Sequence, residues 1–415
     1  MAVVLAYMSP ALGHLFTFAA VLNELQSRGH TIHVRTLAAG VTMCREQGFA
    51  AEPVDRRIEV LQTADTTLRV LKSARDTVRV LTERAAHEVD DISRAIADAD
   101  PDVLIVDANC WGAMAVAETQ SRPWLALSPF LPYLRSPGSP PFGAGARPRT
   151  GLYGRIRDLG VGAVTHLVFD RPLRRGMLPI RRALGVPQVR SADELMRRAP
   201  RTLVATAKPF EYRHTDWGDS VEMIGPAHFD PPSPETPGWL DAIDLPIVLV
   251  TTSSVPQSDA MLIHTAVEAL AGDAVHIVVT APTTTGDVTP LGPRVTLAPF
   301  VPHSLVLPKT VCVITHGGLG VTQKALARGI PVCVVPFGRD QFEVARRVEV
   351  AGAGTRLPAR RLSAPRLRAA VRSAMRMAAG AGAIAEGFAD TGGVPHAADV
   401  VEQALHQSAI GPSRT

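Results

Sequence analysis

Two residues early in the chain have the chemistry of an acid–base pair. His14 comes shortly after the apolar run 3–8 and near the start of a helical pattern, whereas Asp107 directly follows the apolar run 102–106. A histidine can act as a general base near neutral pH, and a carboxylate bonded to it fixes its tautomer and stabilises the imidazolium. The pair therefore predicts a site that removes a proton. Each residue taken alone is also compatible with a helix cap or a turn.

A second candidate is the glycine-rich segment 315–322 (THGGLGVT), which follows the apolar run 311–314 and opens another helical pattern. Backbone N–H groups at a helix N-terminus attract anions, and glycines let an anion approach closely. His316 adds a donor that can carry positive charge, and Thr322 adds a hydroxyl. The segment is neither the GxGxxG dinucleotide fingerprint nor a Walker A loop. It predicts a phosphate site of another kind.

A third candidate is the pair Asp340 and Gln341, which follows the apolar run 332–335 at the start of a helical pattern. A carboxylate accepts hydrogen bonds from hydroxyl groups, and an amide both accepts and donates, so the pair suits a polyol such as a sugar. The alternative is that Asp340 only caps the helix.

Short apolar runs alternate with longer helical patterns over 3–127, and the alternation restarts at 246 after the proline-rich segment 225–238. Such alternation is typical of parallel sheets with helices on both faces. The sequence predicts an α/β fold with two Rossmann-like, doubly wound domains, 1–224 and 239–390, joined by the linker 225–238. Ligands bind at the carboxyl ends of the strands in such sheets, so all three candidates face the cleft between the domains.

Composition excludes several classes of protein. The 415 residues include 43 Lys+Arg and 39 Asp+Glu, and 46% are hydrophobic, which does not fit a disordered chain. No apolar run reaches the roughly 18–20 residues of a membrane helix, and the first residues lack the basic start and cleavage site of a signal peptide. The thiols are too scattered for a disulfide framework or a zinc site and fit a reducing, cytoplasmic location: Cys44, Cys110, Cys312 and Cys333.

One region is strongly basic: residues 145–215 contain fifteen Arg or Lys and five Asp or Glu. Two interpretations remain open, a solvated helical face or a surface for an anionic partner such as a membrane or an acidic acceptor. Nucleic acid is not predicted, because no basic run with interleaved aromatic residues and no nucleic-acid-binding module is present.

The order of these motifs resembles a known family. Gly13-His14 after the first strand, Asp107 after the fourth, and the block 300–341 are similar to the family 1 glycosyltransferases of the GT-B fold, most closely the bacterial natural-product type. The resemblance implies an inverting enzyme that uses a UDP- or dTDP-sugar as co-substrate, with no cofactor and no metal. It implies a hydrophobic small-molecule acceptor such as a polyketide or polyphenol. It also implies a C-terminal helix, 391–408, that packs back on the first domain, and a homodimer is left open.

The resemblance also assigns roles to individual residues. His14 would be the base that deprotonates the acceptor, and Asp107 would orient it. Asp98 and Asp100 spell a DxD, but they fall at a helix end before a proline, so no metal site is predicted there. Donor contacts are implied at Ser254, Phe300, Val301, His303, His316, Gly318, Gly320, Thr322, Asp340 and Gln341, and acceptor contacts at Phe16, Trp111, Phe130, Phe142 and the loop 136–151.

Three positions depart from the family pattern. Lys324 stands where the family usually has a ribose-binding glutamate, Ser253 where it has a glycine, and Val344 where it has an asparagine. A lysine side chain donates hydrogen bonds but cannot accept them, so the ribose must be held in another way or the donor preference has changed.

Two other functions remain as alternatives. A sugar-nucleotide epimerase of the same two-domain build would need acidic residues and histidines around the sugar. A non-catalytic homologue that binds a sugar nucleotide and stabilises a partner transferase would not need His14 and Asp107, both of which are present.

Overall fold

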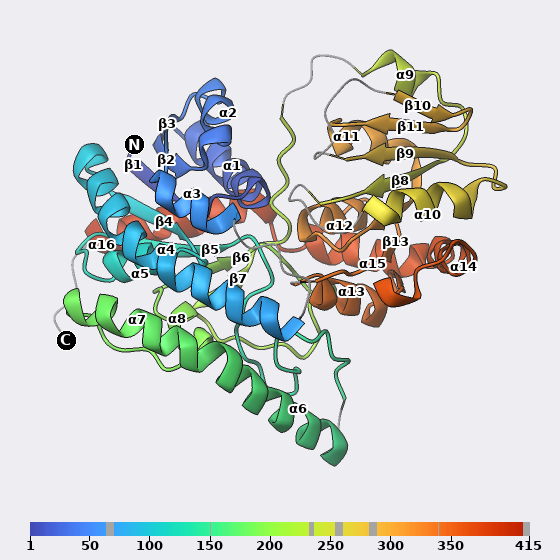
Figure 1. Ribbon diagram of the computed structural model, residues 1–415. Helices are drawn as coiled ribbons and strands as arrows, with labels where there is room; N and C mark the ends of the chain where they lie inside the picture. Colours follow the sequence, from blue (N-terminus) through green and yellow to red (C-terminus); the bar gives the residue numbers. More distant parts are fainter. Residues whose placement is uncertain are drawn as a thin grey trace.

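The computed structural model describes residues 1–63, 70–149, 151–231, 236–253, 260–281, 289–338 and 340–409. It has two α/β lobes, each built around a seven-stranded sheet (Figure 1). The predicted fold class of two doubly wound domains is confirmed. The last strand of the first sheet ends at Met223 and the first strand of the second sheet begins at Ile247, on either side of the expected linker.

The strands described in the first sheet are all parallel, and its central strands β1, β4 and β5 are almost entirely buried and mostly apolar. Both sides of such a sheet are covered by helices, which explains why these strands lack an alternating pattern. Its strands, in spatial order, are β3 (Ala50–Pro53), β2 (Thr31–Thr36), β1 (Val3–Tyr7), β4 (Val103–Asp107), β5 (Trp124–Ser128), β6 (Thr202–Val204) and β7 (Val221–Met223). Because β1 lies directly beside β4, the loops that follow these two strands meet at one edge of the sheet.

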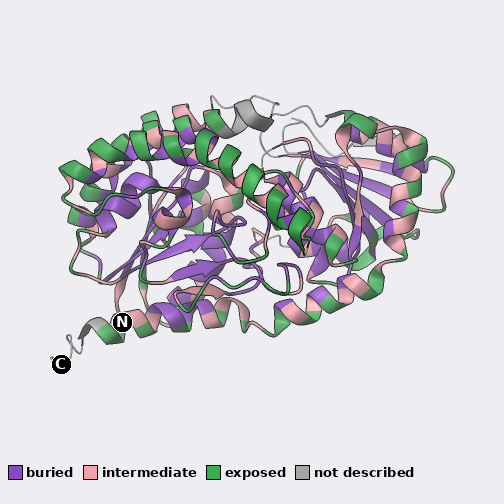
Figure 2. Ribbon diagram, turned by 90° about the horizontal axis from the view of Figure 1, so that it is seen from below, coloured by how far each residue is buried: buried purple, intermediate pink, exposed green. Residues whose placement is uncertain are grey.

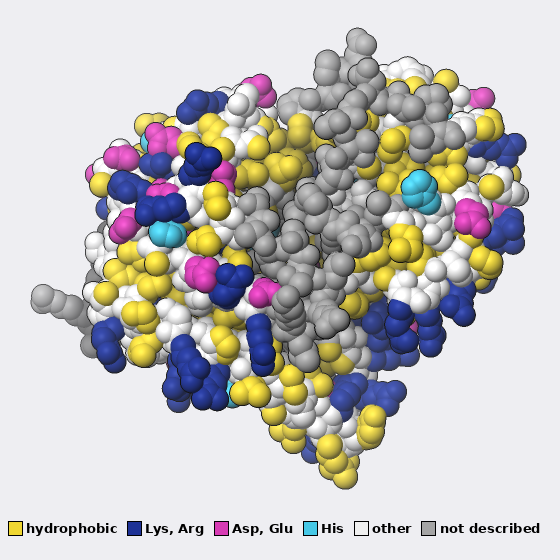
Figure 3. Space-filling model, in the orientation of Figure 1, with side chains coloured by type: hydrophobic (Ala, Val, Ile, Leu, Met, Phe, Trp, Pro, Cys, Tyr) yellow, Lys and Arg dark blue, Asp and Glu magenta, His cyan; other side chains and the backbone are white. Residues whose placement is uncertain are grey.

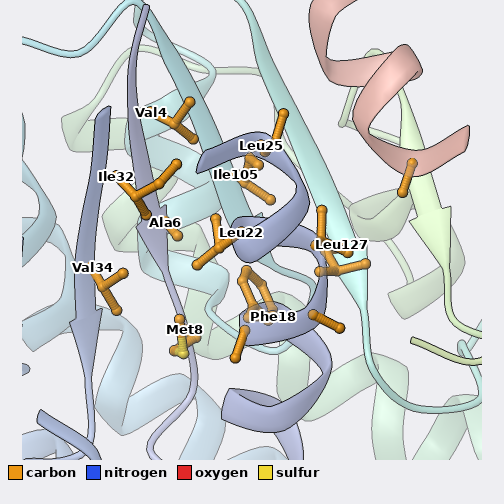
Figure 4. Close-up of a cluster of buried hydrophobic side chains, with 14 of the residues drawn as sticks. Val4, Ala6, Met8, Phe18, Leu22, Leu25, Ile32, Val34, Ile105 and Leu127 are labelled. Carbon is orange, nitrogen blue, oxygen red and sulfur yellow. The ribbon is translucent and has the colours of Figure 1, made fainter. Parts of the chain in front are cut away.

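Helices cover both faces of this sheet. Figure 4 shows Phe18, Leu22 and Leu25 of α1 packed against apolar side chains of β1, β2, β4 and β5. The helices of this lobe are α1 (Leu12–Ser27), α2 (Val41–Glu46), α3 (Arg56–Thr63), α4 (Val70–Ala99), α5 (Trp111–Ala117), α6 (Leu152–Thr165), α7 (Arg171–Ala183) and α8 (Ala192–Met196), with short turns η1 (Ala38–Gly40) and η2 (His166–Asp170).

The second sheet has the order β10 (Thr289–Gly292), β11 (Val295–Ala298), β9 (His276–Thr280), β8 (Ile247–Thr251), β12 (Thr310–Thr315), β13 (Val332–Val334) and β14 (Gly354–Arg356). Only the edge strand β10 is antiparallel to its neighbour. The helices are α9 (Gly238–Asp241), α10 (Ala260–Leu270), α11 (His303–Val306), α12 (Leu319–Leu326), α13 (Gln341–Val350), α14 (Ala364–Met375) and α15 (Ala378–Ala389), with short turns η3 (Leu307–Lys309) and η4 (Ala359–Arg361).

The last helix, α16 (Gly393–Ala409), returns to the first lobe and lies against α1 (Figure 1). Arg28 of α1 donates hydrogen bonds to Asp399 and Glu402, and Ala397 and Val401 join the apolar cluster beneath α1. The chain thus connects the two lobes twice, once through the linker and once through α16.

The edge strands and α6 were not anticipated from the sequence. The burial of β3 alternates poorly, with one buried residue in four, and β6, β7 and β14 are only three residues long. Such short strands leave no readable hydrophobic period. Among the described residues, no helix combines the length and apolar character needed to cross a membrane.

Candidate active site

His14 and Asp107 are in direct contact. His14 lies in the first turn of α1, and Asp107 is the last residue of β4. The distance between His14 Nδ1 and Asp107 Oδ2 is 2.5 Å, and the carboxylate is fully buried while the imidazole is 18% exposed. The contact exists because β1 and β4 are paired strands.

Further hydrogen bonds fix the Asp107 carboxylate. The backbone N–H of Ser9 donates to Oδ2 at 3.1 Å, and that of Asn109 donates to Oδ1 at 2.8 Å. These two donors hold the carboxylate in one orientation. When the Asp107 carboxylate accepts the Nδ1–H of His14, the other ring nitrogen, Nε2, keeps a lone pair that can accept a proton.

A cavity of about 2250 Å³ opens in front of His14 and is lined by residues of both lobes. The first lobe contributes Ser9, His14, Phe130 and the loop 136–149, and the second contributes the turn after β12 and the start of α13. The structure therefore brings together seven predicted site residues at one cavity, together with Ser253: His14, Phe130, Phe142, His316, Gly318, Asp340 and Gln341.

Aromatic rings form one wall of this cavity. The ring of Phe130 stacks on His14 with centroids 5.7 Å apart, and Tyr133 packs against Phe130, Phe142 and Phe169 at 5.0–5.3 Å. Burial raises the pKa of the Tyr133 phenol. The phenol therefore stays protonated at neutral pH and offers a hydrogen bond within an otherwise apolar surface.

The glycine-rich turn has the geometry of a helix N-terminus. Gly318 is the N-cap of α12, and Gly317 has φ +101°, a conformation that glycine adopts without strain. A side chain at Gly318 would place its Cβ 2.9 Å from His316 Nε2. Thr322 is fully buried and its hydroxyl donates to the Gly318 carbonyl at 2.8 Å, so it shapes the turn from within the helix.

Asp340 and Gln341 lie at the cavity, at the start of α13. Gln341 is 4% exposed, and its Oε1 accepts from the N–H groups of Phe337 and Gly338 at 2.8 and 3.1 Å. The amide thus holds the turn that presents Asp340. Val344, which replaces the family asparagine, is buried in the apolar core of the second lobe.

A lysine–aspartate ion pair joins α12 of the second lobe to the linker, close to Phe16 of α1. Lys324 of α12 pairs with Asp230 of the linker and also donates to the carbonyl of Phe229 at 3.0 Å. Asp230 accepts from the N–H of Ser304 at 2.9 Å as well. Burial opposes ionisation of Asp230, but Lys324 and the Ser304 N–H together lower its pKa below the usual value. A carboxylate is therefore present beside residue 324, supplied by the linker.

The predicted base-binding residues directly precede Ser304, whose N–H donates to Asp230. Phe300 is 56% exposed, whereas Val301 is buried. His303 shares a hydrogen bond of 3.2 Å with Thr280, and burial, followed by the charge of Lys324, lowers its pKa to about 4. The imidazole is therefore neutral at pH 7.

Two predicted acceptor contacts do not reach the cavity. Phe16 packs against Phe229 with centroids 6.1 Å apart and lies 6.0 Å from Lys324 Nζ. Trp111 is fully buried at the start of α5, behind Phe169. Gly320 is exposed and Ser254 lies outside the described residues.

Sequence reasoning missed Ser9, Asn109, Tyr133 and Arg84, all of which line the cavity. The first two are within five residues of His14 or Asp107 and could have been found from that proximity. Arg84 is fully buried in α4 and donates to Ser9 Oγ at 2.9 Å. Nothing in its sequence neighbourhood distinguishes it from the exposed arginines of the same helix.

Comparison with known proteins identifies relatives over nearly the whole chain. Residues 264–406 match the family described as "Erythromycin biosynthesis protein CIII-like, C-terminal domain". The 4'-demethylrebeccamycin synthase of Lentzea aerocolonigenes is 30% identical over 420 residues, covering 96% of this chain and 98% of the relative. The O-mycaminosyltylonolide 6-deoxyallosyltransferase of Streptomyces fradiae is 27% identical and covers 94% of both chains.

Solved structures show the same fold. The calicheamicin glycosyltransferase CalG4 matches with a TM-score of 0.72 at 20% identity, covering 98% of this chain and 99% of that one. The glycosyltransferase VinC, solved in complex with dTDP, matches with a TM-score of 0.70 at 19% identity, covering 98% and 100%. With the near-complete match to the rebeccamycin relative, these findings show that the chain belongs to the natural-product glycosyltransferases of the GT-B fold.

Proposed function

We propose that this glycosyltransferase moves a sugar from a UDP- or dTDP-sugar to a hydroxyl group of a hydrophobic small molecule, with inversion at the anomeric carbon. The observation that carries the proposal is the contact between His14 and Asp107 on the wall of the cavity that also holds His316 and Asp340. A base, an anion-binding turn and a polyol-binding carboxylate thus face the same space.

The reaction is a single displacement. The acceptor hydroxyl gives its proton to His14 Nε2 while its oxygen bonds to the anomeric carbon, and the bond from that carbon to the diphosphate oxygen breaks with its electron pair. Asp107 stabilises the imidazolium that forms. The N-terminus of α12 and His316 stabilise the negative charge that develops on the diphosphate.

The linker carboxylate replaces the missing family glutamate in this proposal. Asp230 is held beside Lys324 and Ser304, and its oxygens can accept from the ribose hydroxyls that Lys324 cannot serve. Phe300, four residues before Ser304, is exposed and offers a ring on which a base can stack. The complexes of VinC and of the Streptomyces glycosyltransferase SsfS6 with thymidine diphosphate favour dTDP as the donor nucleotide.

The aromatic wall supports a hydrophobic acceptor. Phe130, Tyr133 and Phe142 form one cluster of tilted and edge-to-face rings that lines the cavity, and such rings bury apolar surface effectively. The Tyr133 hydroxyl can orient a polar group of the acceptor. The names of two relatives, 4'-demethylrebeccamycin synthase and O-mycaminosyltylonolide 6-deoxyallosyltransferase, support a secondary metabolite as the acceptor.

A transfer assay tests the proposal. The purified protein is incubated with UDP- and dTDP-sugars and a panel of phenolic and macrocyclic acceptors, and mass spectrometry follows the product. We expect product from the wild type and a loss of at least about 100-fold in kcat for His14→Ala, the range typical of general-base removal. Asp107→Asn should lose a comparable factor. Transfer that survives His14→Ala would contradict the base assignment, and donor binding without turnover would favour the auxiliary homologue.

A further inference from the structure

Helix α6 carries a stripe of exposed apolar side chains. Leu152, Ile156, Leu159 and Leu167 of α6 and the following turn are 74%, 59%, 74% and 54% exposed. Their spacing places them on one side of a helix. Figure 3 shows hydrophobic side chains gathered at the tip of the protrusion that α6 forms, and Figure 2 shows exposed residues along this helix.

This stripe is not the outer face of a core helix. Within α6, all of whose residues are described, only Gly154 is buried. Single exposed apolar residues are common on protein surfaces, but a contiguous series of large ones marks a contact surface. The helix therefore presents apolar area that no described part of this chain covers.

The segment that follows adds positive charge. Arg171, Arg174, Arg175 and Arg182 of α7 are exposed, and none of the four has an acidic partner among the described residues. Other arginines of the basic region are structural, since Arg181 binds Glu118 with two hydrogen bonds of 2.7 and 2.8 Å. Four arginines of the region that have no acidic partner among the described residues thus lie on the helix that follows the apolar stripe in the chain.

We propose that the face formed by the α6 stripe and the exposed arginines of α7 docks on an anionic lipid bilayer. Apolar side chains that enter the lipid interface, flanked by cations that meet headgroup phosphates, are the two components of peripheral binding. Charge complementarity favours this occupant over a second copy of the chain, which would bring the same arginines together.

The position of α6 connects the docking surface to the cavity in front of His14. Tyr153, Leu159 and Val164 line the cavity in front of His14 as well as the exposed face. A bilayer seated on α6 would lie at the entrance of that cavity, where an apolar acceptor dissolved in lipid can reach it. This consequence rests on the proposed function, whereas the docking itself does not.

Co-sedimentation with vesicles tests the docking. The full-length wild type is mixed with vesicles of phosphatidylcholine alone or of phosphatidylcholine with phosphatidylglycerol, without any sugar donor. We expect binding to the anionic vesicles only, weakening as salt is raised. Arg174→Gln with Arg175→Gln should lower the partition coefficient by about fivefold for each arginine. Leu152→Ser with Ile156→Ser should lower the partition coefficient at low salt and at high salt.

Matched controls come from the second lobe. Arg360→Gln with Arg361→Gln removes two exposed arginines, and Met261→Ser removes an apolar residue that is 59% exposed. Neither change should affect partition. Equal loss in the controls, or no wild-type binding to anionic vesicles, would overturn the proposal. Light scattering that shows a dimer, dissociated by Leu152→Ser with Ile156→Ser, would instead identify the stripe as an interface between copies.

None of the four substituted α6 and α7 residues lines the cavity. Transfer to a water-soluble phenol should therefore be unchanged in these variants even if vesicle binding is lost. Failure of transfer in the wild type would contradict the proposed function and leave the docking result intact.

Discussion

Two buried arginine–glutamate clusters stabilise the surroundings of the cavity. One lies within the first lobe, and the other joins the two lobes. Arg84 and Glu88 lie on α4, entirely inside the first lobe, with both side chains fully buried. Arg347 and Glu343 of α13 form the second cluster with Glu211, a residue of the first lobe. The first cluster is local and the second joins the lobes.

The local cluster connects the two loops that carry the acid–base pair. Arg84 donates to Ser9 Oγ at 2.9 Å, in the loop before His14, and to the Asn109 carbonyl at 3.4 Å, in the loop after Asp107. Glu88 accepts from Arg84 and, at 2.9 Å, from the N–H of Gly112 at the start of α5. The cluster therefore fixes the relative position of the loops next to His14 and Asp107.

The cluster between the lobes attaches the loop 136–149 to α13, the helix that begins beside Asp340. Glu343 Oε1 accepts from the N–H groups of Gly143 and Gly145 at 2.8 and 2.7 Å. Arg347 donates to both carboxylate oxygens of Glu211 at 2.7 and 3.1 Å. The loop 136–149 belongs to the first lobe by sequence, but its hydrogen bonds tie it to α13 of the second.

The two clusters consist of the same residue types, but we expect them to have different effects. Breaking the local pair should disturb the orientation of His14 toward Asp107, and hence the chemical step. Breaking the contact between lobes should disturb the distance between the acceptor wall and Asp340, and hence substrate binding. Both leave an uncompensated buried charge if only one partner is removed, which costs about 3–5 kcal/mol.

The largest effect is expected for Arg84→Met. It should destabilise the protein by about 3–5 kcal/mol, measured by thermal unfolding, and lower kcat more than it raises KM. Arg79→Met is the control on the same helix, because Arg79 is 55% exposed and its pairs should be worth less than about 1 kcal/mol.

A double variant distinguishes position from stability. Arg84→Met with Glu88→Gln removes both buried charges, while the glutamine can still accept from Gly112. We expect most of the stability to return but kcat to stay low, because the bonds to Ser9 and Asn109 are still missing. Recovery of kcat together with stability would show that Arg84 acts only on the fold.

The next largest effect is expected for Gly145→Ala. The new Cβ would lie 2.3 Å from the carbonyl oxygen of Phe342, so the loop must move away from α13. Overlap of this kind costs about 1–3 kcal/mol, and we expect KM for the acceptor to rise with a smaller change in kcat. Gly160→Ala on α6 is the control, since its Cβ would meet nothing within 4 Å. An unchanged acceptor KM in Gly145→Ala would separate the loop from acceptor binding.

The contrast between contacts within one lobe and contacts between elements also explains which site residues could be predicted from the sequence. His14 and Asp107 were predictable because each follows a buried strand, and parallel strands bring their carboxyl ends to one edge. Asp340 and the turn around His316 were predictable for the same reason. These residues depend on the order of strands, which hydrophobic runs encode directly.

Residues that act across elements were not predictable. Arg84 lies in a long helix among other arginines, and only packing decides that it is buried while Arg79 is exposed. Trp111 follows Asp107 closely, but the direction of its side chain at the start of α5 turns it into the core. In both cases the rotation of the helix about its own axis, relative to the rest of the molecule, decides which side chains are buried. A single sequence does not specify that rotation.

A third charged contact, between Lys324 and Asp230, tests whether the linker also contributes to donor binding. Asp230→Asn keeps the shape but removes the charge, and we expect KM for the nucleotide sugar to rise about 5–10-fold, as for the loss of a charged hydrogen bond. KM for the acceptor should not change, in contrast to Gly145→Ala. Asp241→Asn on α9 is the control, because its side chain is exposed. A donor KM unaffected by Asp230→Asn would make the pair purely structural.

The smallest expected effect is on the pH dependence of stability. It involves His303 and His228, two buried histidines near Lys324. Burial and Lys324 lower the pKa of His303 to about 4, and burial lowers that of His228 to about 3. An unfolded chain takes up a proton on each ring near pH 6.5, whereas the folded chain does not, so stability falls as pH drops from 6.5 toward 4. His303→Gln removes one of these protons, and we expect the slope of unfolding free energy against pH between 6.5 and 5 to fall by at most about 1.4 kcal/mol per pH unit, the value for one proton. A slope that stays at the wild-type value would mean that His303 is protonated in the folded protein. The charge of Lys324 would then act on Asp230 without lowering the pKa of His303.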